Sequence, residues 1–166
     1  MKCRELIRAD WSRFRTLSGQ APGGAWKAPL HPRTAPVFWF RISAKLHSMA
    51  LRPLAQLVYL ANLILFRVEI PPHADIGGGL VLPHPGGIVL GSARIGRNVT
   101  IYQNVTLGAR SFDPHYDLSI RPVIDDEAVI GANAVVLGPV TVHKGATVKA
   151  NSLTTQDVLP REAKDA

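Results

Sequence analysis

Histidine is the side chain whose charge changes nearest to neutral pH, and this chain contains six of them. One, His84, stands in a distinctive Pro83-His84-Pro85-Gly86-Gly87 motif, whereas the others lack a paired motif. The single cysteine, Cys3, rules out a zinc site built from several cysteines, and the histidines have no repeated spacing that would gather them around a metal ion. The sequence therefore predicts no metal centre and singles out His84 as the residue that the fold must position.

Composition and charge restrict the kind of protein that carries this histidine. With 46% hydrophobic and 19% charged residues, the chain of 166 residues is expected to fold rather than be disordered, as one modest domain or a domain with a helical appendage. Residues 1–67 have a net charge of +9, and residues 68–166 have a net charge of −2. No nucleic-acid motif accompanies the basic half, so an anionic membrane surface fits it better than nucleic acid. The single cysteine and the lack of a signal-peptide pattern predict a cytoplasmic protein.

A repeat of six residues organises the second half of the sequence. Branched aliphatic residues recur at every sixth position, and Gly or Asn, which tolerate the left-handed backbone of a corner, stand three residues later in seven of twelve hexads. Each hexad then forms a strand and a corner, and three sides close one coil of a solenoid; an ordinary β-sandwich would not need a strict period. The repeat is interrupted after Leu107, which predicts a loop over 110–123. The aliphatic positions are Ile70, Ile76, Leu82, Ile88, Ile95, Ile101, Leu107, Ile124, Ile130, Val136, Val142 and Val148.

These hexads resemble the hexapeptide repeats of the left-handed parallel β-helix acyltransferases. Within that superfamily the chain is most similar to serine acetyltransferase, through the stretches 68–70, 76–77, 82–91, 98–108 and 130–134. The resemblance implies a mostly β fold, a left-handed parallel β-helix of about four coils at 68–155, preceded by an α-helical region at 1–67 and followed by a short tail at 156–166. It also implies a homotrimer with each active site at the seam between two prisms.

The resemblance also implies the chemistry. The catalytic histidine of the family falls on His84, and its carboxylate partner falls on Glu69, where the family has aspartate; a solvated charge is the other interpretation of Glu69. His84 would remove the proton from an acceptor hydroxyl as this attacks the thioester of acetyl-CoA, while Glu69 would orient the ring. Their separation of fifteen residues, slightly less than one coil, agrees with this. The positions that correspond to the CoA site are Gly108, Ala109, Ala132, Ala150 and Lys149, with Lys144 as a further cation that, like Lys149, could be an exposed turn residue.

The acceptor site is where the sequence departs from serine acetyltransferase. The family has an acidic residue before the catalytic histidine and an Arg-His pair in the loop, and this chain has Pro83 and Ile120-Arg121 in these places. Because Pro83 and Ile120 cannot pair with the charges of serine, we expect a saccharide hydroxyl of exopolysaccharide or envelope synthesis, free or lipid-linked, held by Arg121 and His115. The alternative is serine O-acetyltransferase of cysteine synthesis. A non-catalytic β-helix scaffold is a hypothesis of a different class.

Two helices are expected in the basic half, at 35–49 and 51–68. The apolar run 54–66 would be about 20 Å long as a helix, too short for a bilayer core of about 30 Å. With basic and aromatic residues beside it, this helix either lies on the inner surface of the membrane or caps the first coil and builds the trimer interface. Residues 1–34 are expected to form a short helix and a flexible link.

Overall fold

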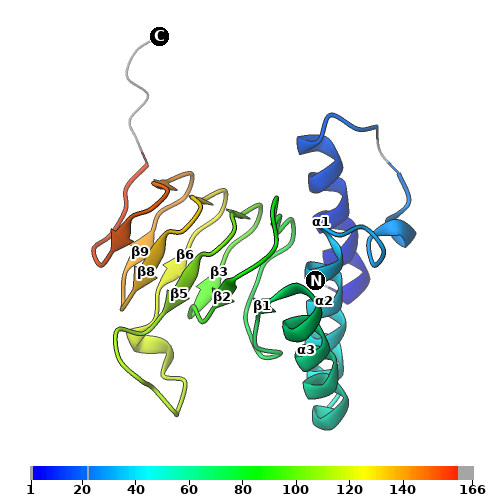
Figure 1. The fold of residues 1–166 in the computed structure, drawn as a ribbon, viewed down its shortest axis with the longest axis horizontal. Coiled ribbons are helices and arrows are strands. Elements are labelled where there is room, and N and C mark those ends of the chain that lie inside the picture. Colours follow the sequence, from blue (N-terminus) through cyan, green and yellow to red (C-terminus); the bar gives the residue numbers. More distant parts are fainter. Residues whose placement is uncertain (1, 22, 161–166) are drawn as a thin grey trace.

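In the computed structural model, which describes residues 2–21 and 23–160, helices pack against one end of a stack of short strands (Figure 1). Three α-helices come first, α1 (Cys3–Leu17), α2 (Ala35–Ser48) and α3 (Arg52–Phe66), with the 3₁₀ turn η1 (Ala25–Lys27) between α1 and α2. A second 3₁₀ turn, η2 (Leu118–Ile120), lies among the strands. The strands are β1 (Val68–Glu69), β2 (Ile88–Leu90), β3 (Arg94–Ile95), β4 (Thr100–Ile101), β5 (Thr106–Gly108), β6 (Val123–Ile124), β7 (Val129–Ile130), β8 (Val135–Leu137), β9 (Thr141–Val142), β10 (Thr147–Val148) and β11 (Leu153–Thr154).

The strands form three parallel ladders, which are the three sides of a β-helix. The first side contains β1, β2, β5, β8 and β11, the second contains β3, β6 and β9, and the third contains β4, β7 and β10. Strand β8 pairs with β11 eighteen residues later, which is the length of one regular coil. Strand β5 pairs with β8 twenty-nine residues later, because residues 109–122 leave the coil as a loop. The loop therefore begins and ends one residue earlier than predicted, since Val123 already pairs with Thr141.

The core of the β-helix follows the sequence repeat. All twelve aliphatic positions point inward, and none is exposed by more than 6%. Full burial of such a side chain contributes about 1.5–3 kcal/mol, so the column supplies much of the driving force for coiling. Ser111, the small residue that follows Leu107 in the hexad pattern, is exposed because it lies in the loop. The repeat therefore predicted both the buried column and the place where the chain leaves it.

Asparagine side chains join the corners of successive coils. Asn104, Asn133 and Asn151 all have φ between +57° and +59°, the left-handed region that a tight corner needs. Their carboxamides form a ladder, in which Asn104 donates to Asn133 over 3.0 Å and Asn133 donates to Asn151 over 2.7 Å. Glu127 adopts φ +63° at another corner, where the sequence offers neither Gly nor Asn.

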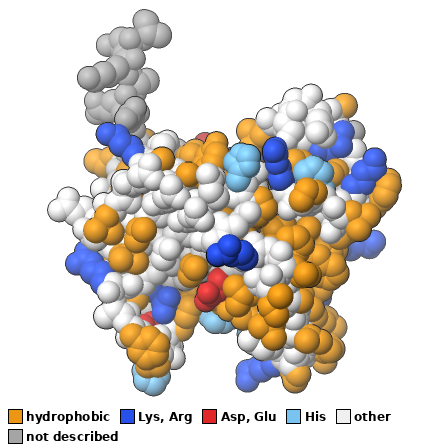
Figure 2. Space-filling model, viewed as in Figure 1, with side chains coloured by type: hydrophobic (Ala, Val, Ile, Leu, Met, Phe, Trp, Pro, Cys, Tyr) orange, Lys and Arg blue, Asp and Glu red, His pale blue; other side chains and the backbone are white. Residues whose placement is uncertain are grey.

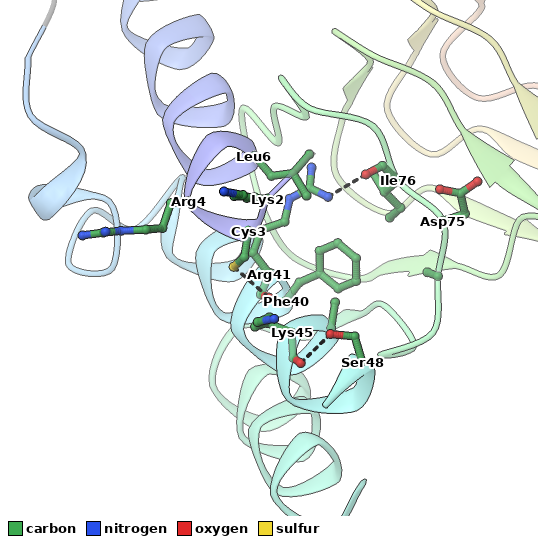
Figure 3. A pocket seen from close by; sticks show the side chains of 12 residues that line it. Lys2, Cys3, Arg4, Leu6, Phe40, Arg41, Lys45, Ser48, Asp75 and Ile76 are labelled. Atoms are coloured by element: carbon green, nitrogen blue, oxygen red, sulfur yellow. Dashed lines mark hydrogen bonds between the residues drawn. The ribbon is translucent and has the colours of Figure 1, made fainter. Parts of the chain in front are cut away.

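A buried ion pair holds the helices against the first coil. Arg41 of α2 donates from Nε to the Asp10 carboxylate of α1 over 2.9 Å, and its Nη1 donates to the carbonyl oxygen of Ile76 over 2.7 Å (Figure 3). The same carboxylate accepts the backbone N–H groups of Gly79 (2.7 Å) and Leu80 (2.9 Å). Both side chains are almost fully buried. The helical region is therefore docked on the β-helix through polar contacts as well as apolar packing.

Several predicted boundaries in the helical region were wrong. Helix α3 ends at Phe66, because Arg67 takes the left-handed conformation at φ +56° and Val68 pairs in β1. Parts of the expected flexible link pack against α1, since the Gly23 carbonyl accepts from Trp11 Nε1 over 3.0 Å and Ala28 is buried with Trp11 and Phe14. Backbone pairing reaches Val158, inside the expected tail 156–166, and residues 161–166 of that tail lie outside the described residues.

Candidate active site

His84 lies at a corner between the third and first sides of the β-helix. The corner follows the bridge that Val81 makes to Thr100 and precedes β2. His84 is exposed, and Pro83 before it is half-buried. An exposed imidazole at a rigid corner can meet a hydroxyl that arrives from solvent, which a general base requires.

The corner of His84 and the equivalent corners of the next three coils form a continuous edge. We call it the histidine edge, and it consists of residues 83–87, 102–105, 131–134 and 149–152. Backbone hydrogen bonds of 2.9–3.0 Å connect these corners, from Asn104 to Gly86, from Asn133 to Gln103 and from Asn151 to Ala132. The histidine edge thus brings together His84, Ala132, Ala150 and Lys149 from the predicted site. Small side chains at Ala132 and Ala150 leave the space that a ligand between adjacent coils needs.

Gln103 is a residue of the histidine edge that the sequence analysis missed. It lies between the small residues Gly86 and Ala132 in successive coils. Its Oε1 atom is buried and has no hydrogen-bond partner among the residues that the structure describes. A buried acceptor without a donor costs about 1–3 kcal/mol, which makes this atom an unusual feature of the edge. No sequence signal distinguishes this position from an ordinary polar corner residue.

Glu69 lies in β1, where it pairs with Val89 of β2. Val68 points into the core, so the Glu69 side chain is directed to the outer surface of the first side. Burial and then the nearby Glu69 carboxylate raise the pKa of Tyr59 in α3. Burial raises the pKa of Tyr116 in the loop, against the charge of Arg121, and the Glu69 charge acts in the same direction as burial. The described residues thus place the Glu69 carboxylate beside Tyr59; its role in orienting His84 stays a prediction.

Two further predicted CoA positions, Gly108 and Ala109, lie along a second edge, where the first side turns into the loop. Gly108 ends β5 and Ala109 opens the loop. A Cβ atom built on Gly108 would meet no atom within 4 Å, so this position faces open space. Lys144 lies elsewhere and forms an ion pair of 3.6 Å with Glu127. The predicted CoA positions therefore lie on the two edges of the first side. Ala132, Lys149 and Ala150 lie on the histidine edge, and Gly108 and Ala109 lie on the other edge.

Arg121 holds the loop on the β-helix. Its guanidinium donates to Asp113 over 2.7 Å and to the carbonyl oxygen of Gly91 over 2.9 Å, and it lies 3.7 Å from the centre of the Tyr116 ring. Although desolvation raises the pKa of the Asp113 carboxyl, the hydrogen bond from Arg121 and two backbone N–H groups hold it below its usual value. His115, in contrast, is exposed. The Arg121 side chain is therefore engaged within the loop, and its contact with an acceptor stays a prediction.

The loop is also connected to the helices through a row of rings. His47 of α2 lies 6.2 Å from His73, and His73 packs edge-on against Tyr116 with ring centres 4.5 Å apart. Tyr116 takes φ +54°, an uncommon conformation for a residue of its size. This row fixes the loop relative to the first coil, and the sequence analysis did not find it because its members are far apart in the chain.

One cavity lies away from the histidine edge. It has a volume of about 660 Å³ and lies between α1, α2 and the corner at 74–76, and none of the predicted site residues lines it (Figure 3). Among the described residues, no group of three or more His, Cys, Asp or Glu side chains is arranged to hold a metal ion.

Comparison with known proteins agrees with this geometry. A serine acetyltransferase of Mycobacterium tuberculosis is 31% identical over 93% of this chain and 66% of its own length. The structure of soybean serine acetyltransferase complexed with serine matches with a TM-score of 0.81 and 32% identity, over 96% of this chain and 65% of that chain. A serine acetyltransferase structure in complex with CoA matches with a TM-score of 0.79 and 27% identity, over 95% and 64%. No protein-family model matches the chain.

The fold and the repeat define a hexapeptide-repeat protein with a left-handed parallel β-helix, which confirms the predicted fold class. More closely, the chain belongs to the serine acetyltransferase-like acyltransferases of that fold, as its sequence motifs indicated. The chain spans 41–66% of the length of the curated relatives that it matches, about half in most of them. The names of the relatives support the alternative of a serine acceptor better than the saccharide.

Proposed function

We propose that the chain is an acetyl-CoA-dependent O-acetyltransferase whose acceptor is L-serine. The observation that carries the proposal is the histidine edge, on which exposed His84 stands above the small residues Ala132 and Ala150 of the following coils. This arrangement places a base above a row of small residues along which the pantetheine arm would lie, with Lys149 in the last of these corners for the phosphates. Membership of the serine acetyltransferase-like family supports both the reaction and the acceptor. The predicted homotrimer is part of the proposal.

In this mechanism His84 moves one proton twice. Its neutral ring takes the proton of the acceptor hydroxyl while the oxygen attacks the acetyl carbonyl, and the C–O bond of the ester forms. When the C–S bond of the thioester breaks, the protonated ring gives the proton to the departing thiolate. The role proposed for Glu69 is to orient the ring of His84 and to stabilise the transient imidazolium with its negative charge. Gln103 contributes an acceptor for a donor group of the bound substrates.

The test is release of free CoA thiol from acetyl-CoA in the presence of L-serine. His84→Ala should lower turnover about 10²–10⁴-fold, the usual contribution of a general base, with little change in acetyl-CoA affinity by calorimetry. Glu69→Gln should cost less, because it removes a charge and not the base. His143→Ala is the matched control, since His143 is a partly exposed histidine of another corner. Near-normal turnover of His84→Ala would remove His84 from the mechanism.

A saccharide hydroxyl is the second candidate acceptor, and two observations favour it. Pro83 offers no charge to an ammonium group, and Arg121 is engaged by Asp113. The same assay with nucleotide-linked and lipid-linked sugars separates the candidates: serine turnover with inert sugars supports the proposal, and the reverse supports the saccharide. Pro83→Asp should raise serine turnover in the second case, because it restores a partner for the ammonium group.

A further inference from the structure

Helix α3 is mostly apolar but is buried along only one narrow stripe. Ala55 and Asn62 are its fully buried residues, and they lie two turns apart on the same face. Much of the remaining surface of the helix is formed by large apolar side chains that are exposed by 46–71%. We call this the leucine face, and it consists of Leu54, Leu57, Leu60, Ile64 and Leu65. Figure 2 shows hydrophobic side chains gathered over the helical part of the molecule.

The leucine face continues onto α2. Trp39 of α2 is 38% exposed, and together with Leu57, Ala61, Leu65 and Phe66 it lines a cavity of about 280 Å³ whose wall is almost entirely apolar. Soluble proteins rarely leave a continuous apolar surface of this kind facing water. A surface that is both apolar and hollowed requires a partner that is itself apolar.

The charges around the leucine face identify that partner. The sequence from Trp11 to Val68 contains eight Lys and Arg residues and no Asp or Glu. Three exposed cations lie at the ends of the two helices, Lys45 in the last turn of α2, Arg52 at the start of α3 and Arg67 at its end. A second copy that met this face with its own leucine face would bring the same cations together, whereas anionic lipid head groups would neutralise them.

The length of α3 agrees with a position in the plane of a membrane. Its fifteen residues make a helix about 22 Å long, against about 30 Å for the bilayer core. None of the helices in the described part of the chain is both long and apolar enough to cross a membrane. From the exposed leucines, the flanking cations and this length, we propose that the leucine face docks the protein on an anionic lipid surface, with α3 parallel to the surface and Lys45, Arg52 and Arg67 at head-group level.

The proposal is tested by sedimentation of the full chain with vesicles. Vesicles of phosphatidylcholine containing phosphatidylglycerol should bind the protein, and added salt should weaken the binding, whereas pure phosphatidylcholine should bind it much less. The double variant Leu57→Ser/Ile64→Ser should lose at least about tenfold in affinity, because two inserted side chains are removed. Leu118→Ser/Leu159→Ser is the matched control, with two exposed leucines of the β-helix region, and should bind like the unchanged protein.

A second pair of variants tests the charges without touching the leucines. Arg52→Gln and Arg67→Gln should each weaken binding to anionic vesicles about fivefold and leave the residual binding to neutral vesicles unchanged. Circular dichroism establishes that each variant is folded. Equal binding by all variants, or no preference for anionic vesicles, would overturn the proposal. So would a change of oligomeric state in Leu57→Ser/Ile64→Ser without any vesicle binding, which would assign the face to a second copy. The activity assay is independent of all these outcomes.

Discussion

Replacement of Asp10 by alanine should strongly destabilise the contact between the helices and the first coil. The carboxylate accepts four hydrogen bonds, from Nε and Nη2 of Arg41 at 2.9 and 3.2 Å and from the backbone of Gly79 and Leu80 at 2.7 and 2.9 Å. Arg41 is only 3% exposed, so Asp10→Ala would leave a buried, unpaired guanidinium. Loss of one partner of a buried ion pair costs about 3–5 kcal/mol, a large part of the 5–15 kcal/mol that stabilises an average domain.

A double-mutant cycle in urea denaturation measures the pair itself. Arg41→Met should also lose about 3–5 kcal/mol, because it leaves the buried Asp10 charge without its cation. Asp10→Ala/Arg41→Met should lose clearly less than the sum, since neither charge is then stranded. The exposed pair of Arg94 and Asp125, 2.8 Å apart, is the matched control, and its coupling should not exceed about 1 kcal/mol. Equal coupling free energies in the two cycles would refute the argument that burial strengthens the coupling between Asp10 and Arg41.

Two further predictions concern pH and an unpartnered atom. Burial, followed by the charges of His47 and Arg121, lowers the pKa of His73, so the folded protein binds this proton less tightly than the unfolded chain. The contribution of neutral His73 to stability is therefore complete above the ordinary value of about 6.5 and falls as pH decreases from there, and His73→Asn should flatten this slope in urea titrations. Gln103→Leu should raise the melting temperature, because it removes a buried acceptor without a donor, and should lower acetyl transfer if substrate supplies that donor. An unchanged pH slope in His73→Asn would argue against the role of His73. An unchanged melting temperature in Gln103→Leu would argue against the cost of its buried acceptor, and unchanged acetyl transfer would argue against its contact with substrate.

The β-helix could be predicted from the sequence because its structure repeats a local rule. Every hexad places one aliphatic residue inward, so a count along the chain is enough to find Ile95, Ile101 and the rest of the buried column. Corners were predicted from Asn and Gly, and Asn98 and Asn104 do adopt positive φ. Glu127 shows the limit of that rule, since packing of the neighbouring coils forces the same backbone on a residue with no preference for it.

The ends of the elements in the helical region could not be predicted in the same way. Val68 is apolar and is separated from the run 54–66 by Arg67 alone, so hydropathy extends the helix through it. The helix ends because Arg67 takes the left-handed conformation and its N–H group donates to the Leu63 carbonyl over 2.9 Å. Arginine is not a usual residue for this position, so the sequence contains no stop signal. The pairing of Val68 with Ile88 in the first coil decides the boundary.

In the site, too, the residues that the repeat places could be predicted from the sequence, whereas contacts between segments far apart in the chain could not. Motif register predicted that His84, Ala132 and Ala150 belong together, and they lie on one edge because a period of eighteen residues returns the chain to the same corner. What surrounds Glu69 depends instead on α3 and on the loop, two segments outside the repeat that bring Tyr59 and Tyr116 near its carboxylate. Arg121 likewise has a partner that the repeat does not predict, Asp113, eight residues before it in the loop. The repeat therefore specifies where His84 lies, whereas the segments outside the repeat determine what surrounds Glu69 and Arg121.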